Sequence, residues 1–211
     1  MVNGRFILHL SLNGIKQLDT VLRSRFGLFL AVWLLTFAGS AAVFSQYPLL
    51  MQTLFGITPD ISSVAFSVMA GLGLTLYTPA GNWSERFGSV PILRISLIMR
   101  LVAFIGLFAL GFSHFGFQGW LALVAFAFVV FAWSLMSVSG TALAADLSPV
   151  GEGEGMGIFN AVNALAGVVG AALGGWVAGS WGYTTTSIVA VAGVTSGLML
   201  SLLFRGKESK S

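Results

Sequence analysis

Six long apolar stretches follow one another along this chain of 211 residues, separated by short segments rich in glycine, proline and polar side chains. A helix needs about 20 mostly apolar residues to cross the hydrocarbon core of a bilayer, and each stretch is long enough. The stretches are too long for barrel strands and lack the strict alternation of such strands. The predicted transmembrane helices cover residues 26–51, 61–79, 91–112, 117–145, 156–179 and 183–204.

The amino-acid composition agrees with a chain that lies in a membrane. Hydrophobic residues make up 56% of it and charged residues 8%, whereas roughly a quarter of an ordinary soluble domain is charged. The mean hydropathy of +0.93 is too high for a water-soluble globule, which cannot bury so many apolar side chains in one core. Because the chain has no cysteine, disulfides, a thiolate nucleophile and cysteine metal ligands are excluded. We expect no metal and no cofactor.

The predicted fold is an all-α membrane protein with three parts. Residues 25–205 form the six-helix transmembrane domain, and residues 206–211 form a cytoplasmic tail. Residues 1–24 place leucines on roughly one helical face, which predicts an amphipathic segment on the membrane surface. A disordered leader is the alternative for this segment.

Lysine and arginine predict which side of the membrane each connection faces, because cytoplasmic segments are enriched in these residues. Nine of the ten basic residues lie on one side of the predicted topology: before the first span, around the second connection or after the last span. These are Arg5, Lys16, Arg23, Arg25, Arg86, Arg94, Arg205, Lys207 and Lys210. We therefore expect both chain ends in the cytoplasm and the protein in the cell membrane.

The predicted spans divide into two groups of three, in residues 26–112 and 117–204, of nearly equal length. Because three is an odd number, the second group must cross the membrane in the opposite direction to the first. Inverted repeats of this kind are a known architecture of transporters. The fold is therefore predicted as two inverted three-helix repeats.

Two connections contain patterns more specific than hydrophobicity. The second reads Gly81-Asn-Trp-Ser-Glu85-Arg86-Phe-Gly88, which resembles the G-x-x-x-(D/E)-(R/K)-x-G signature of the major facilitator superfamily. In that family the signature lies in the cytoplasmic loop after the second helix of each six-helix half, which is its place here. The fourth connection, within residues 144–160, looks like the segment between the tenth and eleventh helices of the family. The glycines of residues 167–175 are similar to those of the eleventh helix.

The resemblance covers about residues 25–205 and fits the C-terminal half of a twelve-helix transporter, with residues 1–24 similar to the linker between halves. It implies a second six-helix half, which a separate chain or a second copy in a homodimer would supply. A gene fragment is the alternative. The fourth connection departs from the family pattern, because glycines and acidic residues stand where an arginine is frequent.

The chemistry of the signature residues predicts their roles. Gly81 and Gly88 permit a tight turn and close approach of helices, and Glu85 could cap the positive end of a neighbouring helix. Arg86 could pair with Asp146 at the cytoplasmic level and latch one conformational state. The alternative is a solvated loop whose charges only enforce topology.

Small and polar residues inside the spans are candidates for helix packing and for a cavity. The glycines of the fifth span leave one side of it small, which predicts close packing and is compatible with a hinge. They are Gly167, Gly170, Gly174 and Gly175. Polar side chains at membrane depth need partners inside the protein, so some of them are expected to line a cavity. The cavity candidates are Gln46, Trp133, Ser137, Asn160 and Asn163.

Arg100 lies inside the third span, where a charge is costly. We expect its side chain to snorkel to the cytoplasmic interface; the alternative is that it faces the interior and binds an anion or a carboxylate. No aspartate or glutamate lies well inside a predicted span, so the sequence offers no evident membrane-embedded proton acceptor.

The leading functional hypothesis is secondary transport of a small molecule by alternating access, with this chain as one six-helix half in the lipid bilayer. An intramembrane serine protease would need a general base near Ser137 or Ser139, and the two histidines, His9 and His114, lie outside the spans. We therefore expect no catalytic residue and no enzyme.

Other classes of function find less support in the sequence. A channel would need a filter sequence or rings of charge, which the chain lacks. A non-transporting membrane scaffold or a truncated transporter remains the alternative, and no feature points to nucleic acid. The apolar, aromatic-rich spans favour a hydrophobic or neutral solute, with efflux of a drug-like compound as the example.

Overall fold

The computed structural model describes residues 19–113 and 115–204, and these residues form helices and turns without a strand. Most of the predicted surface segment 1–24 and all of the predicted tail 206–211 lie outside them. The helices are α2 Arg25–Phe44, α3 Tyr47–Phe55, α4 Pro59–Leu74, α5 Tyr77–Phe87, α6 Ser89–Leu110, α7 Gln118–Leu147, α8 Glu152–Trp181 and α9 Tyr183–Ser201.

Prolines explain why the first two predicted spans are not continuous helices. A proline inside a helix removes a hydrogen bond and pushes its ring against the carbonyl four residues earlier. Pro48 stands four residues after Phe44, where α2 ends, and α3 begins anew at Tyr47. Pro79 stands four residues after Thr75, where the second span divides into α4 and α5 with a bend of 45°.

Two segments that the sequence suggested as loops are largely helical, so that prediction is wrong for them. Helix α5 continues through Phe87, and Gly88 alone separates it from α6, with a φ of +88° that favours glycine. No proline follows Pro79 before α6, and a polar helix end at the membrane surface is readily solvated. Helix α8 begins at Glu152, because acidic residues in the first turn interact favourably with the helix dipole.

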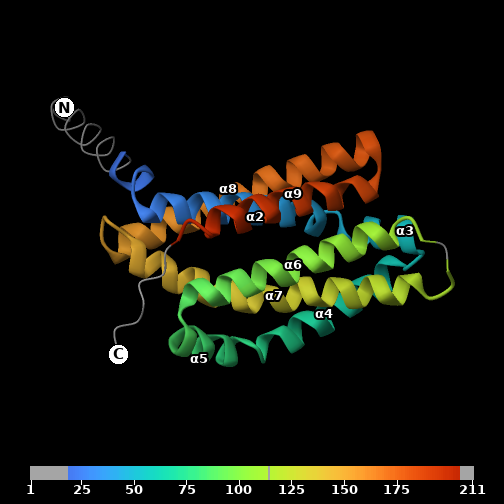
Figure 1. Cartoon of the computed structure of the whole chain (residues 1–211). Helices are drawn as coiled ribbons and strands as arrows, with labels where there is room; N and C mark the ends of the chain where they lie inside the picture. The colour runs from blue at the N-terminus through green and yellow to red at the C-terminus, as the bar shows by residue number, and fades with distance from the viewer. Residues whose placement is uncertain (1–18, 114, 205–211) are drawn as a thin grey trace, which may run out of the picture.

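Within the described residues, the helices α2, α6, α7, α8 and α9 are long and apolar enough to cross a membrane, and the bent pair α4–α5 forms a sixth span when taken as one. Figure 1 shows these helices side by side along one axis of the molecule. The prediction of an all-α, multi-pass membrane protein is confirmed.

The packing of the helices has the pattern of two inverted repeats. Helix α2 packs against α8 and α9, whereas α7 packs against α4, α5 and α6. In the two repeats α2 corresponds to α7, the pair α4–α5 to α8, and α6 to α9. The contacts of α2 with α8 and α9 therefore correspond to those of α7 with α4–α5 and α6. The contact of α6 with α9 corresponds to itself. In Figure 1 the helices α2 and α7 run in opposite directions, as an inverted repeat requires.

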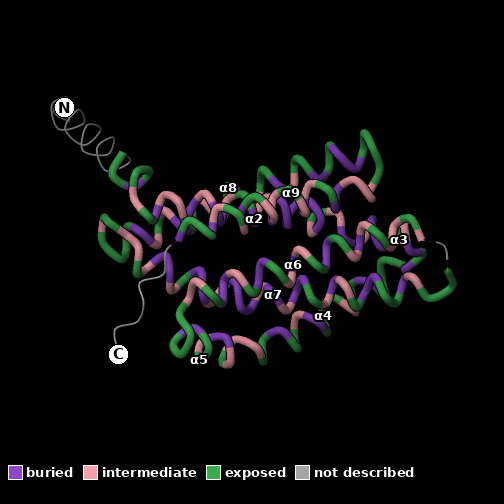
Figure 2. Tube along the Cα trace, viewed as in Figure 1, coloured by how far each residue is buried: buried purple, intermediate pink, exposed green. Residues whose placement is uncertain are grey.

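Large side chains of α2, α6 and α7 fill the interior, and Figure 2 shows buried residues concentrated on their facing sides. Trp33, Phe104 and Phe126 are buried there. The second helix of each repeat is the most exposed: α4 buries only Ser62, Met69 and Gly73, and 17% of the most apolar part of α8 is buried.

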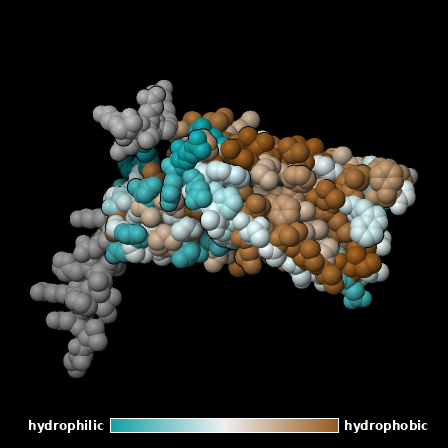
Figure 3. All heavy atoms as spheres, turned by 90° about the horizontal axis from the view of Figure 1, so that it is seen from below, coloured by the Kyte–Doolittle hydropathy of each residue, from teal (hydrophilic) through white to brown (hydrophobic). Residues whose placement is uncertain are grey.

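The molecule is polar at one end. Figure 3 shows hydrophilic residues gathered over the end at which Figure 1 places the α5–α6 and α7–α8 connections, and hydrophobic residues over the rest of this face. Arg86, Glu152 and Glu154 lie in or next to these connections. An apolar body with a charged end matches a bilayer-embedded bundle whose charges lie at one membrane surface.

Candidate functional site

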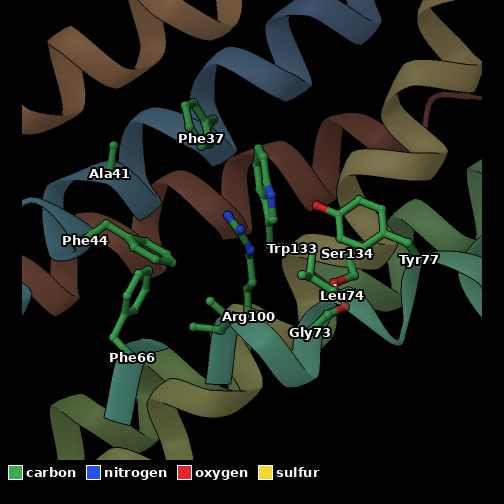
Figure 4. A pocket seen from close by; sticks show the side chains of 12 residues that line it. Phe37, Ala41, Phe44, Phe66, Gly73, Leu74, Tyr77, Arg100, Trp133 and Ser134 are labelled. Atoms are coloured by element: carbon green, nitrogen blue, oxygen red, sulfur yellow. Dashed lines mark hydrogen bonds between the residues drawn. The ribbon is translucent and has the colours of Figure 1, made fainter. Parts of the chain in front are cut away.

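A cavity of about 440 Å³ lies between the first four spans, and both repeats contribute to its wall. Its aromatic wall consists of Phe37 and Phe44 from α2, Phe66 from α4, Tyr77 from α5, and Trp133 from α7. Figure 4 shows the guanidinium of Arg100 pointing between these rings. The volume lies within the range of small-molecule sites, roughly 300–1,000 Å³.

Ser134 connects the cavity wall across two helices. Its hydroxyl donates a hydrogen bond of 2.7 Å to the carbonyl oxygen of Gly73, so α7 is attached to α4 just before the bend. The cavity wall continues past the bend, since Leu74 and Tyr77 also line it. The bend in the second span is therefore part of the cavity wall.

Arg100 is completely buried, and its side chain faces the interior. Its Nη1 donates a hydrogen bond of 2.8 Å to Oγ of Ser40 on α2. Its Cζ lies 5.5 Å from the ring centroid of Trp133, within the range of a cation–π contact. The Nε and Nη2 atoms have no hydrogen-bond partner in the described part of the chain. The expectation that Arg100 snorkels to the interface is wrong.

Ser40 is itself held in place by the helix that bears it. Its hydroxyl donates a 2.8 Å hydrogen bond to the carbonyl oxygen of Thr36, which leaves the lone pairs of Oγ free to accept the Arg100 hydrogen. Both Ser40 and Thr36 are buried. The position of one guanidinium edge is thus fixed through a short hydrogen-bonded chain to the backbone of α2.

The structure brings one of the predicted cavity residues, Trp133, to the wall of this cavity. Gln46, Ser137, Asn160 and Asn163 are not among the residues that line it. For those four a contact with a solute stays a prediction.

Three of these four residues have surroundings outside the cavity that the structure describes. Asn163 accepts a hydrogen bond of 2.9 Å from Nε1 of Trp33, which joins α8 to α2. Gln46 lies beside Ser45 at the α2–α3 break, and Asn160 is exposed. Asn163 therefore has a packing role in this conformation.

An aromatic cluster lies behind the cavity wall and connects both repeats. The ring centroid of Trp133 is 5.4 Å from that of Phe37 and 6.3 Å from that of Trp33. Trp33 in turn meets Phe159 of α8 edge to face at 4.7 Å. Such contacts are worth about 0.5–1.5 kcal/mol each beyond buried area, so the wall is a firm surface.

The glycines predicted in the fifth span lie along α8, and two of them meet α2 without room for a side chain. A Cβ on Gly170 would strike Ala38 and Ala41, and a Cβ on Gly174 would strike the backbone of Ala42. Gly167 and Gly175 have ordinary contacts with Phe37 and Gln46 instead. Close packing by small residues is a common way for membrane helices to associate. A hinge at these glycines stays a prediction.

The face of α2 that meets α9 is packed in the same way, which the sequence did not reveal. A Cβ on Gly193 of α9 would lie 2.6 Å from the carbonyl oxygen of Leu35 and 2.9 Å from the Cα of Gly39. The repeated spacing of glycines in α9 is the signal that would have found this contact.

The signature residues lie in and just after α5. Glu85 and Arg86 are exposed, and a Cβ on Gly81 would meet nothing within 4 Å. Arg86 and Asp146 each stand one residue before the end of α5 and α7, two helices that pack together. The Cζ of Arg86 lies 5.2 Å from the ring centroid of Phe87. The capping role of Glu85 and the latch of Arg86 with Asp146 stay predictions.

The chain was also compared with known proteins. The sequence model of the Major Facilitator Superfamily matches residues 28–211, which is most of the chain. A search of the curated proteins gave no match.

Proposed function

The chain belongs to the major facilitator superfamily, and from that premise we propose that it moves a small molecule across a membrane by alternating access. The observation that supports this most directly is the cavity of about 440 Å³ whose wall is built from both repeats. A solute held between two inverted units can be exposed to either side when one unit rocks against the other.

Discontinuous helices beside the cavity support the same proposal. The second span is bent by 45° between α4 and α5, and residues on both sides of the bend line the cavity. The first span is divided between α2 and α3. Transporters use broken helices of this kind next to their solute sites, because a break lets part of a helix move without the rest.

A second six-helix half is part of this proposal. Helices α4 and α8 bury little of their apolar surface, and they occupy equivalent places in the two repeats. Gly81 on α5 faces open space, which would admit another helix at close range. The second half would come from a separate chain or from a second copy, and this chain would correspond to the C-terminal half of a twelve-helix relative. Apart from this second half, the proposal requires only the lipid bilayer as a partner of the chain.

The proposed orientation places the polar end of the bundle, with Arg86 and Arg94, at the cytoplasmic face of the cell membrane. Cytoplasmic connections are enriched in arginine and lysine, and the described connections at the other end contain neither residue. Both chain ends would then face the cytoplasm.

The solute is proposed to have an apolar body, because five aromatic side chains form the wall of the cavity. The neutral, drug-like compound favoured by the sequence fits these rings. The buried arginine adds a charge to the site that the sequence-based expectation did not include.

The proposal is tested by filling the cavity. Ala70 lines it, so Ala70→Trp should abolish solute flux in energised vesicles from cells that express the full chain. Val102→Trp, at an exposed position of α6 outside the cavity, is the control and should retain flux. A panel of labelled aromatic and aliphatic solutes is screened first against vesicles without the chain. Flux that survives Ala70→Trp unchanged, or no chain-dependent flux at all, would overturn the proposal and favour a scaffold.

A further inference from the structure

The buried guanidinium of Arg100 narrows the chemistry of the solute. We propose that the cavity binds an organic monoanion, whose carboxylate pairs with Arg100 and whose apolar body lies against the aromatic wall. This inference rests on the proposed function, because it names the class of solute for the same cavity.

The free atoms of Arg100 have the geometry that a carboxylate needs. Ser40 occupies Nη1, and the unpartnered Nε and Nη2 lie along one common edge of the planar guanidinium. Two parallel N–H groups on such an edge bind both oxygens of a carboxylate at once. A neutral carbonyl group has one acceptor oxygen in place of two and brings no negative charge to balance the guanidinium.

The chain supplies no internal counter-ion among the residues that the structure describes. The carboxylates of this part lie in or next to the ends of helices: Asp19, Asp60, Glu85, Asp146, Glu152 and Glu154. The one ion pair recorded between these residues joins Arg23 to Asp19 at the surface. A buried cation without a partner is costly, so a site of this kind is stabilised when an anion arrives.

The surroundings of Arg100 indicate the rest of the molecule. Trp133 flanks the guanidinium, and Phe37 lies 5.4 Å from Trp133, so an aromatic or aliphatic body beside the carboxylate would contact rings. The wall has one cation, which balances one negative charge. A phosphate ester with two charges would keep one unpaired charge in an apolar cavity, and this favours a carboxylate over a phosphate.

A matched pair of probes tests the inference by equilibrium binding. Radiolabelled 1-naphthoate and its neutral analogue 1-naphthamide have nearly the same shape and differ in charge. Binding to the full chain, purified in a neutral detergent together with any half that copurifies, should favour naphthoate by at least tenfold. Equal affinities of the two probes would overturn the inference, including the case in which a carboxylate of the second half already occupies Arg100.

Variants on helix α6 locate the effect. Arg100→Gln should remove the preference for naphthoate and leave the weaker binding of naphthamide unchanged. Arg94→Gln is the control, because Arg94 lies on the same helix and donates to the carbonyl oxygens of Ser201 and Phe204 outside the cavity. A naphthoate preference that persists in Arg100→Gln would overturn the inference. If the Arg100→Gln protein fails to accumulate, Arg100→Lys is the substitute variant. It keeps the positive charge and loses the planar edge, so its preference for naphthoate over naphthamide should be more than onefold and less than tenfold.

Two further comparisons separate this inference from a lipid-binding site and from the proposed transport function. Phosphatidylglycerol added to the detergent should not displace naphthoate; displacement would show that the anion is a lipid headgroup and would overturn the inference. Flux in vesicles separates it from the proposed function. Naphthoate that binds but is not moved leaves the binding site intact and contradicts transport, whereas flux of naphthamide alone supports transport and contradicts the anion site.

Discussion

Arg100 on α6 and Ser40 on α2 are joined by a hydrogen bond of 2.8 Å in the buried interior of the bundle. The two residues are 60 positions apart in the sequence and belong to the first and third spans of the same repeat. The bond fixes a positive charge at one wall of an aromatic cavity. It therefore affects both the stability of the bundle and the chemistry of the site.

Removing the two partners should have opposite effects on stability. Ser40→Ala leaves Arg100 without its recorded hydrogen-bond acceptor and should lower the unfolding free energy by about 1–2 kcal/mol. Arg100→Met removes the buried charge itself and should leave stability unchanged or raise it, because the desolvation cost of the cation disappears. Thermal unfolding in detergent measures both. Ser45→Ala, at an exposed hydroxyl, is the control, and equal losses in Ser40→Ala and Ser45→Ala would contradict the role of the bond.

Packing between α2 and α8 predicts a contrast between two glycines of one helix. Gly174→Ala places a Cβ against the backbone of Ala42 and should cost about 1–3 kcal/mol of stability. Gly179→Ala adds a Cβ with nothing within 4 Å and should be neutral, or stabilising by up to about 1 kcal/mol through helix propensity. Unfolding curves of the two variants, side by side, give the comparison. A Gly174→Ala protein as stable as Gly179→Ala would contradict close packing.

The orientation can be tested cleanly, because the chain has no cysteine of its own. A membrane-impermeant maleimide should label Gly116→Cys from outside intact cells, since this residue lies exposed between α6 and α7. Glu152→Cys, at the start of α8, should react only after the cells are opened. The reverse pattern of labelling would invert the proposed topology.

Arg86 provides a test of the conformational latch. Arg86→Ala should lower flux by roughly tenfold, which corresponds to losing about 1.4 kcal/mol of bias toward one state, and should leave insertion intact. Arg86→Lys should restore part of the flux. The control is Arg23→Ala, which removes another exposed arginine at the same end of the molecule. Flux at the wild-type level in Arg86→Ala would leave the residue with topology as its only function.

A hydrogen bond between repeats gives a further test of packing. Asn163→Leu removes the acceptor for Nε1 of Trp33 and should lower stability by about 1 kcal/mol. Asn160→Leu, one turn earlier at an exposed position, should have no such effect. Tryptophan fluorescence during unfolding reports both variants. Similar unfolding of the two proteins would show that the bond contributes little.

The number of the spans followed from the sequence, because apolar length is a property of a segment and needs no knowledge of contacts. The breaks at Pro48 and Pro79 were within reach of the sequence as well, since a proline inside an apolar run disrupts the helix about one turn before it. They were not predicted, because a run of apolar residues by itself indicates one continuous span.

The rotation of each span about its own axis was the part that the sequence left open. Helices such as α7 are apolar on all sides, so no polar face marks the interior. Arg100 could therefore be assigned to the surface from its depth alone, although it faces the cavity. Trp133 and Asn163 were both named as polar residues at membrane depth; Trp133 lies in the cavity wall, whereas Asn163 pairs with Trp33.

The tether from Ser134 to Gly73 lies on one side of the kink, and Tyr77 lies on the other. A change in the angle of that single span would thus carry Tyr77 inward or outward while Gly73 stays anchored to its neighbour. The width of the cavity then depends on how far the bend between α4 and α5 straightens, as well as on rigid-body rocking of the repeats. A substitution that stiffens the joint would alter turnover without touching any residue that meets the solute.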